Sequence, residues 1–374
     1  ALSSAASDVY KRQVCAFVSI ILISCISYAQ SNTGKDNNLE DFPRLEGEKY
    51  DSARIQRAID ASAFRVLKIP AGDYLLDKPL KIANCASLDM HKSANFTPVS
   101  EMEYMLTFDG ARGFLGKPPF SFGEDHNLFI KGGNFNCKGM SGGVLIMNYH
   151  HFTYKDSTIR NAKTAGLRVD SSLKPGGQGY ELVASNIYLR CTMSGLAGNV
   201  GILSNDGDNH FIDCIVIDYT TGIFVRNGGG LRLTRCHVWG GPVPPAKKGE
   251  LPEMIKDSVC FKLTAGDTLL TDCYADTGMT GFLVDGYQVR LIGCSYYNNY
   301  KAFKMDNPVA VEHKKGKLLV QGCLFTKTSP RAKLYKGNGR DLIWNSNIIN
   351  GFKESEFGLP ENITDYPDIR VDFY

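Results

Sequence analysis

The chain has 374 residues, of which 43% are hydrophobic and 22% are charged, and its formal net charge is only +3. A charge balance this close to neutral, without a long run of lysine or arginine, gives no basis for a nucleic-acid partner or an integral membrane contact. The 38 glycines and 18 tyrosines are compatible with one elongated, well-packed domain, either monomeric or a simple homo-oligomer.

The first residues predict an export signal that is not part of the fold. Lys11 and Arg12 precede an apolar stretch over residues 14–26, and Ser27-Tyr28-Ala29 is typical of a signal-peptide cleavage site. The apolar stretch is too short to favour a transmembrane span. We therefore expect a secreted or periplasmic protein.

The leader leaves one alternative open and sets the domain boundaries. The segment 22–25 resembles a bacterial lipobox, which predicts a lipid anchor at Cys25 instead of release. Residues 1–13 lack an initiator methionine and resemble a translated adaptor, so residues 1–29 are expected to be a non-native leader plus signal peptide. Residues 30–45 are then expected to form a flexible linker, and residues 46–374 a single domain.

Residues 51–62 predict a short amphipathic helix. Ile55, Ala58, Ile59 and Ser62 share one face at helical spacing, and Asp51 or Ser52 is expected to supply the N-cap. A first strand is expected over residues 69–75.

Further along the chain, a cysteine returns in the same local setting, after a short apolar strand, at steps of 22, 37, 21 and 29 residues. In several copies a Gly-led or Ala-led apolar strand follows about eight residues later, as in 222–225, 281–284 and 302–305. A repeat of this kind is typical of a solenoid. The cysteines of this column are Cys214, Cys236, Cys273, Cys294 and Cys323.

Upstream, the same frame puts Asn186 and Ser157 in the cysteine column. Each repeat consists of short Val, Ile, Leu and Phe runs broken by Gly, Asn and Asp, without a helical period. Three short parallel strands per rung fit this pattern, with adjacent rungs about 4.8 Å apart.

This organisation resembles the pectate-lyase-like superfamily, whose fold is a single-stranded right-handed parallel β-helix. The resemblance covers residues 45–350, and the segment 50–61 followed by 69–75 resembles the helix that plugs the end of such solenoids. It implies an all-β domain with an N-terminal capping helix. It also implies that the Gly-led strand and the turn before it form the floor of a substrate cleft.

Two of the eleven cysteines lie in the leader, and an odd number remains. This argues against a complete disulfide framework, and we expect a reduced, buried ladder, although bridges between successive column cysteines stay possible. No C-x-x-C pair or His/Cys cluster with zinc spacing is present, so no metal site is predicted. No cofactor is expected; calcium is possible, but no compact aspartate cluster supports it.

The residues one and three places after each column cysteine are expected to point outward. This predicts one exposed face with His237, Trp239, Tyr274, Asp276 and Tyr297. Flat aromatic rings suit stacking on sugars. The same rule puts Ile187, Leu189, Ile215 and Ile217 on that face, which leaves open that a loop covers it.

A second outward face is expected on the Gly-led strands. It carries Arg168, Lys262 and Lys304, with Arg226 and Asp306 two places further along their strands. Such cations could contact an anionic substrate, or they could be solvated surface charges.

Carboxylates gather in the turns. Asp218 and Asp276 are expected in nearly equivalent positions two rungs apart, about 9 to 10 Å from one another. Asp206 and Asp208 lie in a nearby loop, where they either contact substrate or form an ordinary Asx-rich turn.

These residues are compatible with three functions. A lyase acting on a uronate polymer would use His237 or Tyr274 as the base, Asp276 as acid or orienting partner, and Arg226, Lys262, Arg168 or Lys163 as anion contacts. A hydrolase would draw its carboxylate pair from Asp218, Asp276, Asp206 and Asp208. The third possibility is a carbohydrate-binding adhesin.

The sequence favours the lyase, acting on a polysaccharide or oligosaccharide. It departs from the polygalacturonase-like pattern, because we find no Asn-Thr-Asp, Gly-His-Gly or Arg-Ile-Lys motif. The Pro-rich insertion at 240–249 leaves directly after His237 and Trp239 and is expected to wall the cleft.

Overall fold

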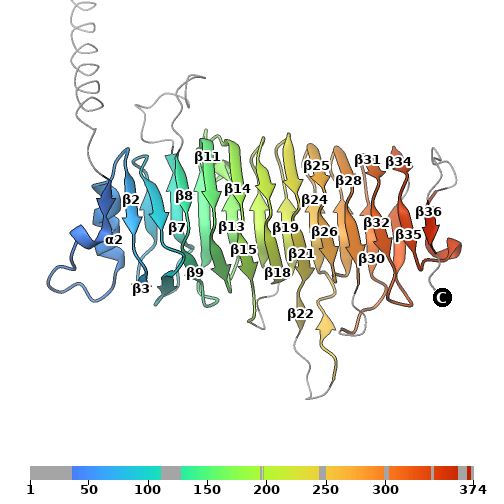
Figure 1. The fold of residues 1–374 in the computed structure, drawn as a ribbon, viewed down its shortest axis with the longest axis horizontal. Helices are drawn as coiled ribbons and strands as arrows, with labels where there is room; N and C mark the ends of the chain where they lie inside the picture. Colours follow the sequence, from blue (N-terminus) through green and yellow to red (C-terminus); the bar gives the residue numbers. More distant parts are fainter. Residues whose placement is uncertain are drawn as a thin grey trace, which may run out of the picture. The chain divides into compact units, whose positions relative to one another are not determined.

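The computed structural model describes residues 36–110, 128–193, 196, 198–243, 250–298, 303–337, 341–360 and 369–371. The chain divides into two compact units, residues 1–37 and 38–374, and the second unit is a coil of short strands (Figure 1). In it the chain passes in turn through three parallel sheets, here named A, B and C, and each strand pairs with its counterpart one coil away. The predicted parallel β-helix is therefore confirmed.

Sheet A is the sheet that precedes the cysteine column. Its strands are β2 (Val66–Ile69), β5 (Ser87–Met90), β8 (Phe129–Lys131), β11 (His150–Lys155), β14 (Tyr180–Ser185), β17 (His210–Ile212), β20 (Leu231–Thr234), β25 (Asp267–Thr271), β28 (Gln288–Ile292), β31 (Lys317–Gln321) and β34 (Leu342–Asn345).

Sheet B follows the cysteine column. Its strands are β3 (Gly72–Leu76), β6 (Ala94–Pro98), β9 (Asn134–Asn136), β12 (Thr158–Arg160), β15 (Tyr188–Arg190), β18 (Ile215–Tyr219), β21 (His237–Gly240), β26 (Tyr274–Asp276), β29 (Ser295–Tyr297), β32 (Leu324–Thr326), β35 (Ile348–Asn350) and β36 (Ile369–Val371).

Sheet C contains the Gly-led strands. They are β4 (Leu80–Ile82), β7 (Tyr104–Asp109), β10 (Gly142–Met147), β13 (Ala165–Val169), β16 (Val200–Ser204), β19 (Thr221–Val225), β24 (Val259–Leu263), β27 (Thr280–Val284), β30 (Val309–His313) and β33 (Lys333–Gly337). Sheet A also includes β1 (Asn37–Asn38), which lies next to β2. The remaining short elements are the 3-10 turns η1 (Leu39–Asp41), η3 (Ser171–Leu173) and η4 (Glu354–Glu356), and the antiparallel pair β22 (Pro242–Val243) and β23 (Glu253–Met254).

The interior is built of columns of like side chains, because parallel register places equivalent residues one rung apart. Phe96 stacks on Phe135 with ring centroids 5.0 Å apart, and Phe261 stacks on Phe282 at 5.2 Å. All four rings are fully buried. These stacks fix the register of successive coils, since a slip of one residue would turn the rings out to solvent.

The cysteine column is buried at the corner between sheets A and B. All nine cysteines of the described residues are free and buried, as predicted. The thiols of Cys236 and Cys273 point to the carbonyl oxygens of Phe211 and Leu233, each at 3.4 Å. Outside the column, burial raises the pKa of the Cys137 thiol to about 12, so this thiol stays protonated at neutral pH.

One assignment to the column was wrong. The backbone bonds run from Tyr188 N to Ser157 O and from Ile215 N to Ile187 O, so Ile187 and not Asn186 occupies the column. Asn186 takes the left-handed position just before it (φ 53°), as Asp213 does in the next coil (φ 54°). The slip of one residue explains why Ile187 and Leu189 were expected outside: both are buried, and Tyr188 and Arg190 take the outward positions.

A second strand was also misplaced. In sheet C, Phe282 pairs with Val311 of β30, so the apolar run 302–305 is not the Gly-led strand of its coil. Glu312 therefore takes the outward position expected for Lys304. Lys304 and Asp306 lie in the turn before β30, because a long insertion delays that strand.

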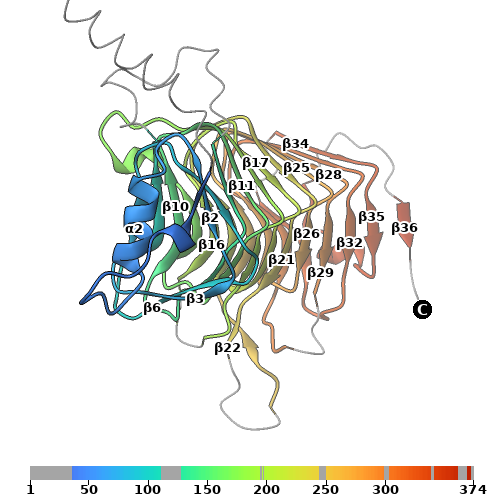
Figure 2. The same ribbon diagram turned by 60° about the vertical axis from the view of Figure 1, so that its left-hand side comes forward.

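The one α-helix of the described residues, α2 (Ser52–Asp60), lies at the N-terminal end of the coil (Figures 1 and 2). Ile55, Ala58 and Ile59 are completely buried in the main core, as the helical spacing predicted. The helix thus covers apolar side chains that would otherwise meet solvent at the first coil.

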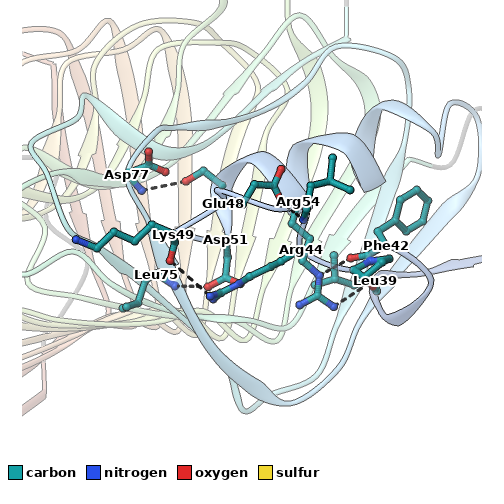
Figure 3. Close-up of polar contacts among 12 residues, drawn as sticks. Leu39, Phe42, Arg44, Glu48, Lys49, Asp51, Arg54, Leu75 and Asp77 are labelled. Carbon is teal, nitrogen blue, oxygen red and sulfur yellow. Dashed lines mark hydrogen bonds and ion pairs between the residues drawn. The ribbon is translucent and has the colours of Figure 1, made fainter.

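The N-terminus of α2 is held differently from the prediction (Figure 3). The Asp51 carboxylate does not cap the helix; it accepts a bond from Leu75 N of β3 at 2.9 Å and pairs with Arg44 at 2.8 Å. The Arg54 side chain donates to the carbonyl of Leu39, which is itself completely buried. The part of the expected linker from residue 38 on thus packs against the helix.

Candidate functional site

The outer face of sheet B brings together the aromatic and acid/base residues predicted from the repeat. In adjacent coils His237 of β21 is the register partner of Tyr274 of β26, and Trp239 is the partner of Asp276. The imidazole and phenol rings stack with centroids 4.7 Å apart and an interplanar angle of 17°. Tyr297 of β29 continues the second row, next to Asp276. We call these five residues the His237 face.

The Asp276 carboxylate connects the members of this face. One of its oxygens lies 3.5 Å from His237 Nε2, and the other accepts a hydrogen bond of 2.6 Å from the Thr277 hydroxyl. Burial, and then the negative charge of Asp276, raise the pKa of the Tyr274 phenol well above its usual value. Tyr274 therefore stays protonated at neutral pH, stacked on an imidazole whose Nε2 lies 3.5 Å from a carboxylate.

Two buried polar atoms of the same face lack a hydrogen-bond partner among the described residues. They are the indole nitrogen of Trp239 and Nε2 of His237, whose contact with Asp276 has only ion-pair geometry. The Trp239 ring meets Phe303 edge to face at 6.3 Å.

The insertion after β21 lies beside this face. β22 and β23 pair antiparallel and project from the coil next to β21 (Figures 1 and 2). The returning chain is held to the next insertion, since Met254 N donates to Lys304 O at 3.0 Å. Residues 244–249, at the centre of the predicted wall, lie outside the described residues.

Asp218 lies on sheet B, but it is not equivalent to Asp276. Pairing shifts between Ile217 and Tyr219, which makes Asp218 the extra residue of a bulge with φ 63°. Ile217, Trp239 and Asp276 align, so the left-handed Thr277 (φ 53°) is the counterpart of Asp218. Burial raises the pKa of Asp218, although Arg190 lies 3.5 Å away and opposes the shift.

The predicted cations do not join the His237 face. Arg168 of β13 and Lys262 of β24 point outward from sheet C, and Arg226, which follows β19, is exposed. Lys262 Nζ lies 4.5 Å from the centre of the Phe224 ring, and Arg168 pairs with the buried Asp170 at 2.6 Å. The alternation of side chains along a strand correctly predicted that Arg168 and Lys262 point outward. The repeat also placed them on a different outward face from His237, which the structure confirms.

Asp206 and Asp208 occupy a third place, at the turn from sheet C to sheet A. They line an open pocket of about 520 Å³ together with Gln178, Tyr180 and Asn227. The Asp206 carboxylate accepts bonds from Ser171 N at 2.9 Å and from the Ser171 hydroxyl at 2.8 Å. Burial raises its pKa to about 6. The turn therefore holds a titratable carboxylate at a polar pocket.

The sequence interpretation missed one cluster. His150, His151 and Glu181 at the start of β11 and β14 bring two imidazoles and a carboxylate together. The available signal was the His-His pair followed one repeat later by a glutamate, but no cysteine marks these two coils.

No helix among the described residues has the length and apolar character needed to cross a membrane.

The fold and these surfaces define the class of protein: a coil of three parallel sheets that presents side chains on its outer faces. The chain matches the family model described as "Right handed beta helix region" over residues 142–353, more than half its length. The chain therefore belongs to the right-handed β-helix family. No curated protein matches it in sequence.

Solved structures agree on the fold. ORF18 of Geobacillus virus E2 has a TM-score of 0.58 at 16% identity over 83% of this chain and 60% of its own. Tailspike protein 2 of bacteriophage CBA120, solved as its enzymatically active domain, has a TM-score of 0.58 at 11% identity over 85% of this chain and 48% of its own.

The tailspike of E. coli bacteriophage HK620, solved with a pentasaccharide, has a TM-score of 0.55 at 13% identity over 84% of this chain and 67% of its own. The chain thus spans only about half to two thirds of these structures. At such identities the likeness is one of fold.

Proposed function

We propose that the protein is an exported carbohydrate-active enzyme that cleaves a polysaccharide at the His237 face. The observation that carries the proposal is the His237 imidazole, stacked on a protonated phenol and 3.5 Å from the Asp276 carboxylate. Trp239 and Tyr297 beside it offer flat rings for sugar stacking. A tailspike that binds a pentasaccharide and another that is enzymatically active have the same fold, which supports this class of substrate.

The geometry favours elimination at a uronate. His237, oriented by Asp276, would take the proton from C5, and the Tyr274 phenol would donate its proton to the leaving oxygen at C4. The C5–H and C4–O bonds break, a C4–C5 double bond forms, and no water is consumed. One cation on this sheet is Arg190, which pairs with Asp218, whereas Arg168 and Lys262 lie on sheet C.

Hydrolysis is the second candidate, and the raised pKa of Asp218 favours it. Burial shifts the pKa of Asp218 in the direction that a general acid needs, although Arg190 opposes the shift. Asp276 is the second carboxyl group, two coils from Asp218 on the same sheet, and it would serve as the base that activates water.

A polysaccharide panel tests the proposal. Elimination gives products that absorb as unsaturated uronates and carry no oxygen from labelled water, whereas hydrolysis gives new reducing ends that contain it. His237→Ala, Asp276→Asn and Tyr274→Phe should each lower turnover at least about a hundredfold, and Trp239→Ala should mainly weaken binding.

The matched control is Leu324→Ser, an exposed residue in the same row as His237, three coils away. It should leave turnover unchanged. Near-normal turnover in all three acid/base variants would refute the assignment of the site. Binding of a polysaccharide without any cleavage would favour the adhesin.

A further inference from the structure

The His150, His151 and Glu181 cluster lies on sheet A, away from the sheet that carries the His237 face. β11 and β14 pair in parallel, with His150 opposite Tyr180 and Phe152 opposite Leu182. His151 and Glu181 therefore occupy equivalent positions in adjacent coils. One nitrogen of each imidazole and a carboxylate oxygen all lie within 4.8 Å of one another.

The backbone explains how two consecutive histidines reach one place. In a regular strand, successive side chains point to opposite faces. His151 adopts φ 50° and Glu181 adopts φ 59°, the left-handed conformation that non-glycine residues rarely take. This interrupts the alternation, and the His150 and His151 rings meet edge to face with centroids 4.3 Å apart.

The distances suit a small metal ion. Glu181 Oε2 lies 3.5 Å from His150 Nε2 and 2.7 Å from His151 Nε2. In a tetrahedral zinc site with bonds of about 2.0 to 2.1 Å, neighbouring ligand atoms are about 3.3 Å apart. The first distance already fits, and the second requires the carboxylate to move by about 0.6 Å.

We propose that His150, His151 and Glu181 bind a divalent transition-metal ion such as Zn²⁺. Two imidazoles and one carboxylate are a ligand set that Zn²⁺ prefers. The same ligand set disfavours Ca²⁺, which requires six or more oxygens. The side chains of His150, His151 and Glu181 are 15%, 48% and 45% exposed. The fourth position would therefore be open to water. The site is independent of the function proposed for the His237 face.

Equilibrium dialysis of the full chain without a polyhistidine tag tests the proposal directly. The expected result is saturable binding of one Zn²⁺ per chain, with a metal-dependent rise in melting temperature. His151→Ala and Glu181→Gln should each raise the Kd at least tenfold and abolish the shift in melting temperature. The control is His91→Ala, an exposed histidine in the turn after β5, which should change neither quantity.

Two results would overturn the proposal. One is Zn²⁺ binding that is absent or is unchanged in both variants. The other is an intense sulfur-to-metal charge-transfer band after Co²⁺ loading, which would assign the ion to the cysteines. Because both altered side chains are exposed, the variants should fold, and an unchanged melting temperature without metal checks this.

Discussion

The buried carboxylate of Asp206 should make the stability of the protein fall as the pH rises. Its pKa in the folded protein is raised from 3.8 to about 6 because burial disfavours the charged form. Between these values the folded state binds more protons than the unfolded state. Stability is therefore greatest below the unfolded pKa and is lost as the pH rises through the folded pKa.

The size of the effect follows from the same values. A rise from 3.8 to about 6, at about 1.4 kcal/mol per pH unit, corresponds to roughly 3 kcal/mol. Asp206→Asn removes the titration, and the amide can still accept the bond from Ser171 N. The free energy of unfolding of the variant, minus that of the wild type, should therefore rise by roughly 2 to 3 kcal/mol from pH 4 to pH 7.

Urea unfolding of both proteins across this pH range measures the difference, since the contributions of all other groups cancel to first order. Asp208→Asn is the control, because it removes the other carboxylate of the same pocket. A difference that does not change with pH, or one that favours the wild type at pH 7, would refute the reasoning. The same profile for Asp208→Asn would assign the effect to local charge instead of burial.

Three further predictions concern the coil. Ile59→Asp should lower the free energy of unfolding by about 3 to 5 kcal/mol in thermal or urea unfolding, because it places a charge against the buried face of α2; the exposed Ala53→Asp should cost far less. The nine described cysteines should resist thiol reagents in the native protein and all react after denaturation without reductant, and missing thiols would reveal bridges. Gly201→Val should destabilise by at least about 2 kcal/mol, since its Cβ would lie 2.2 Å from a methyl group of Val216, whereas Gly229→Ala, with its nearest atom at 4.0 Å, should be tolerated.

The fold was predictable because the recurring cysteine, the strongest signal in the sequence, marks a corner that every coil of the structure has to fill. Each coil must place a small or apolar side chain at the corner between sheets A and B, and the cysteines there recur in the sequence. The frame failed at Asn186, where a left-handed turn residue resembles a small core residue in composition. It failed again at 302–305, where an insertion carries an apolar run that is not a strand of sheet C.

The candidate site was predictable only in part, for a geometric reason. Residues on neighbouring strands of one sheet, such as His237 and Tyr274, are related by simple repetition and were brought together as expected. Arg168 and Lys262 belong to another sheet, and the angle between sheets is not encoded in the spacing of a repeat. The His150 and Glu181 cluster depends on two left-handed backbone positions, which local composition does not reveal.

The central residues of sheet B keep one register from coil to coil, although Asp218 forms a bulge near the end of its strand, and this has a consequence for how the protein can diversify. The turn from sheet B to sheet C is a single residue after β18, whereas after β21 it carries a hairpin, yet Val216, Val238 and Ala275 remain aligned in successive coils. Differences in the length of this turn therefore leave the alignment of the sheet B strands unchanged. Residues 242–254 could therefore be replaced without moving the side chains of the His237 face. Under the proposed function, such a replacement would alter which polysaccharide reaches that face.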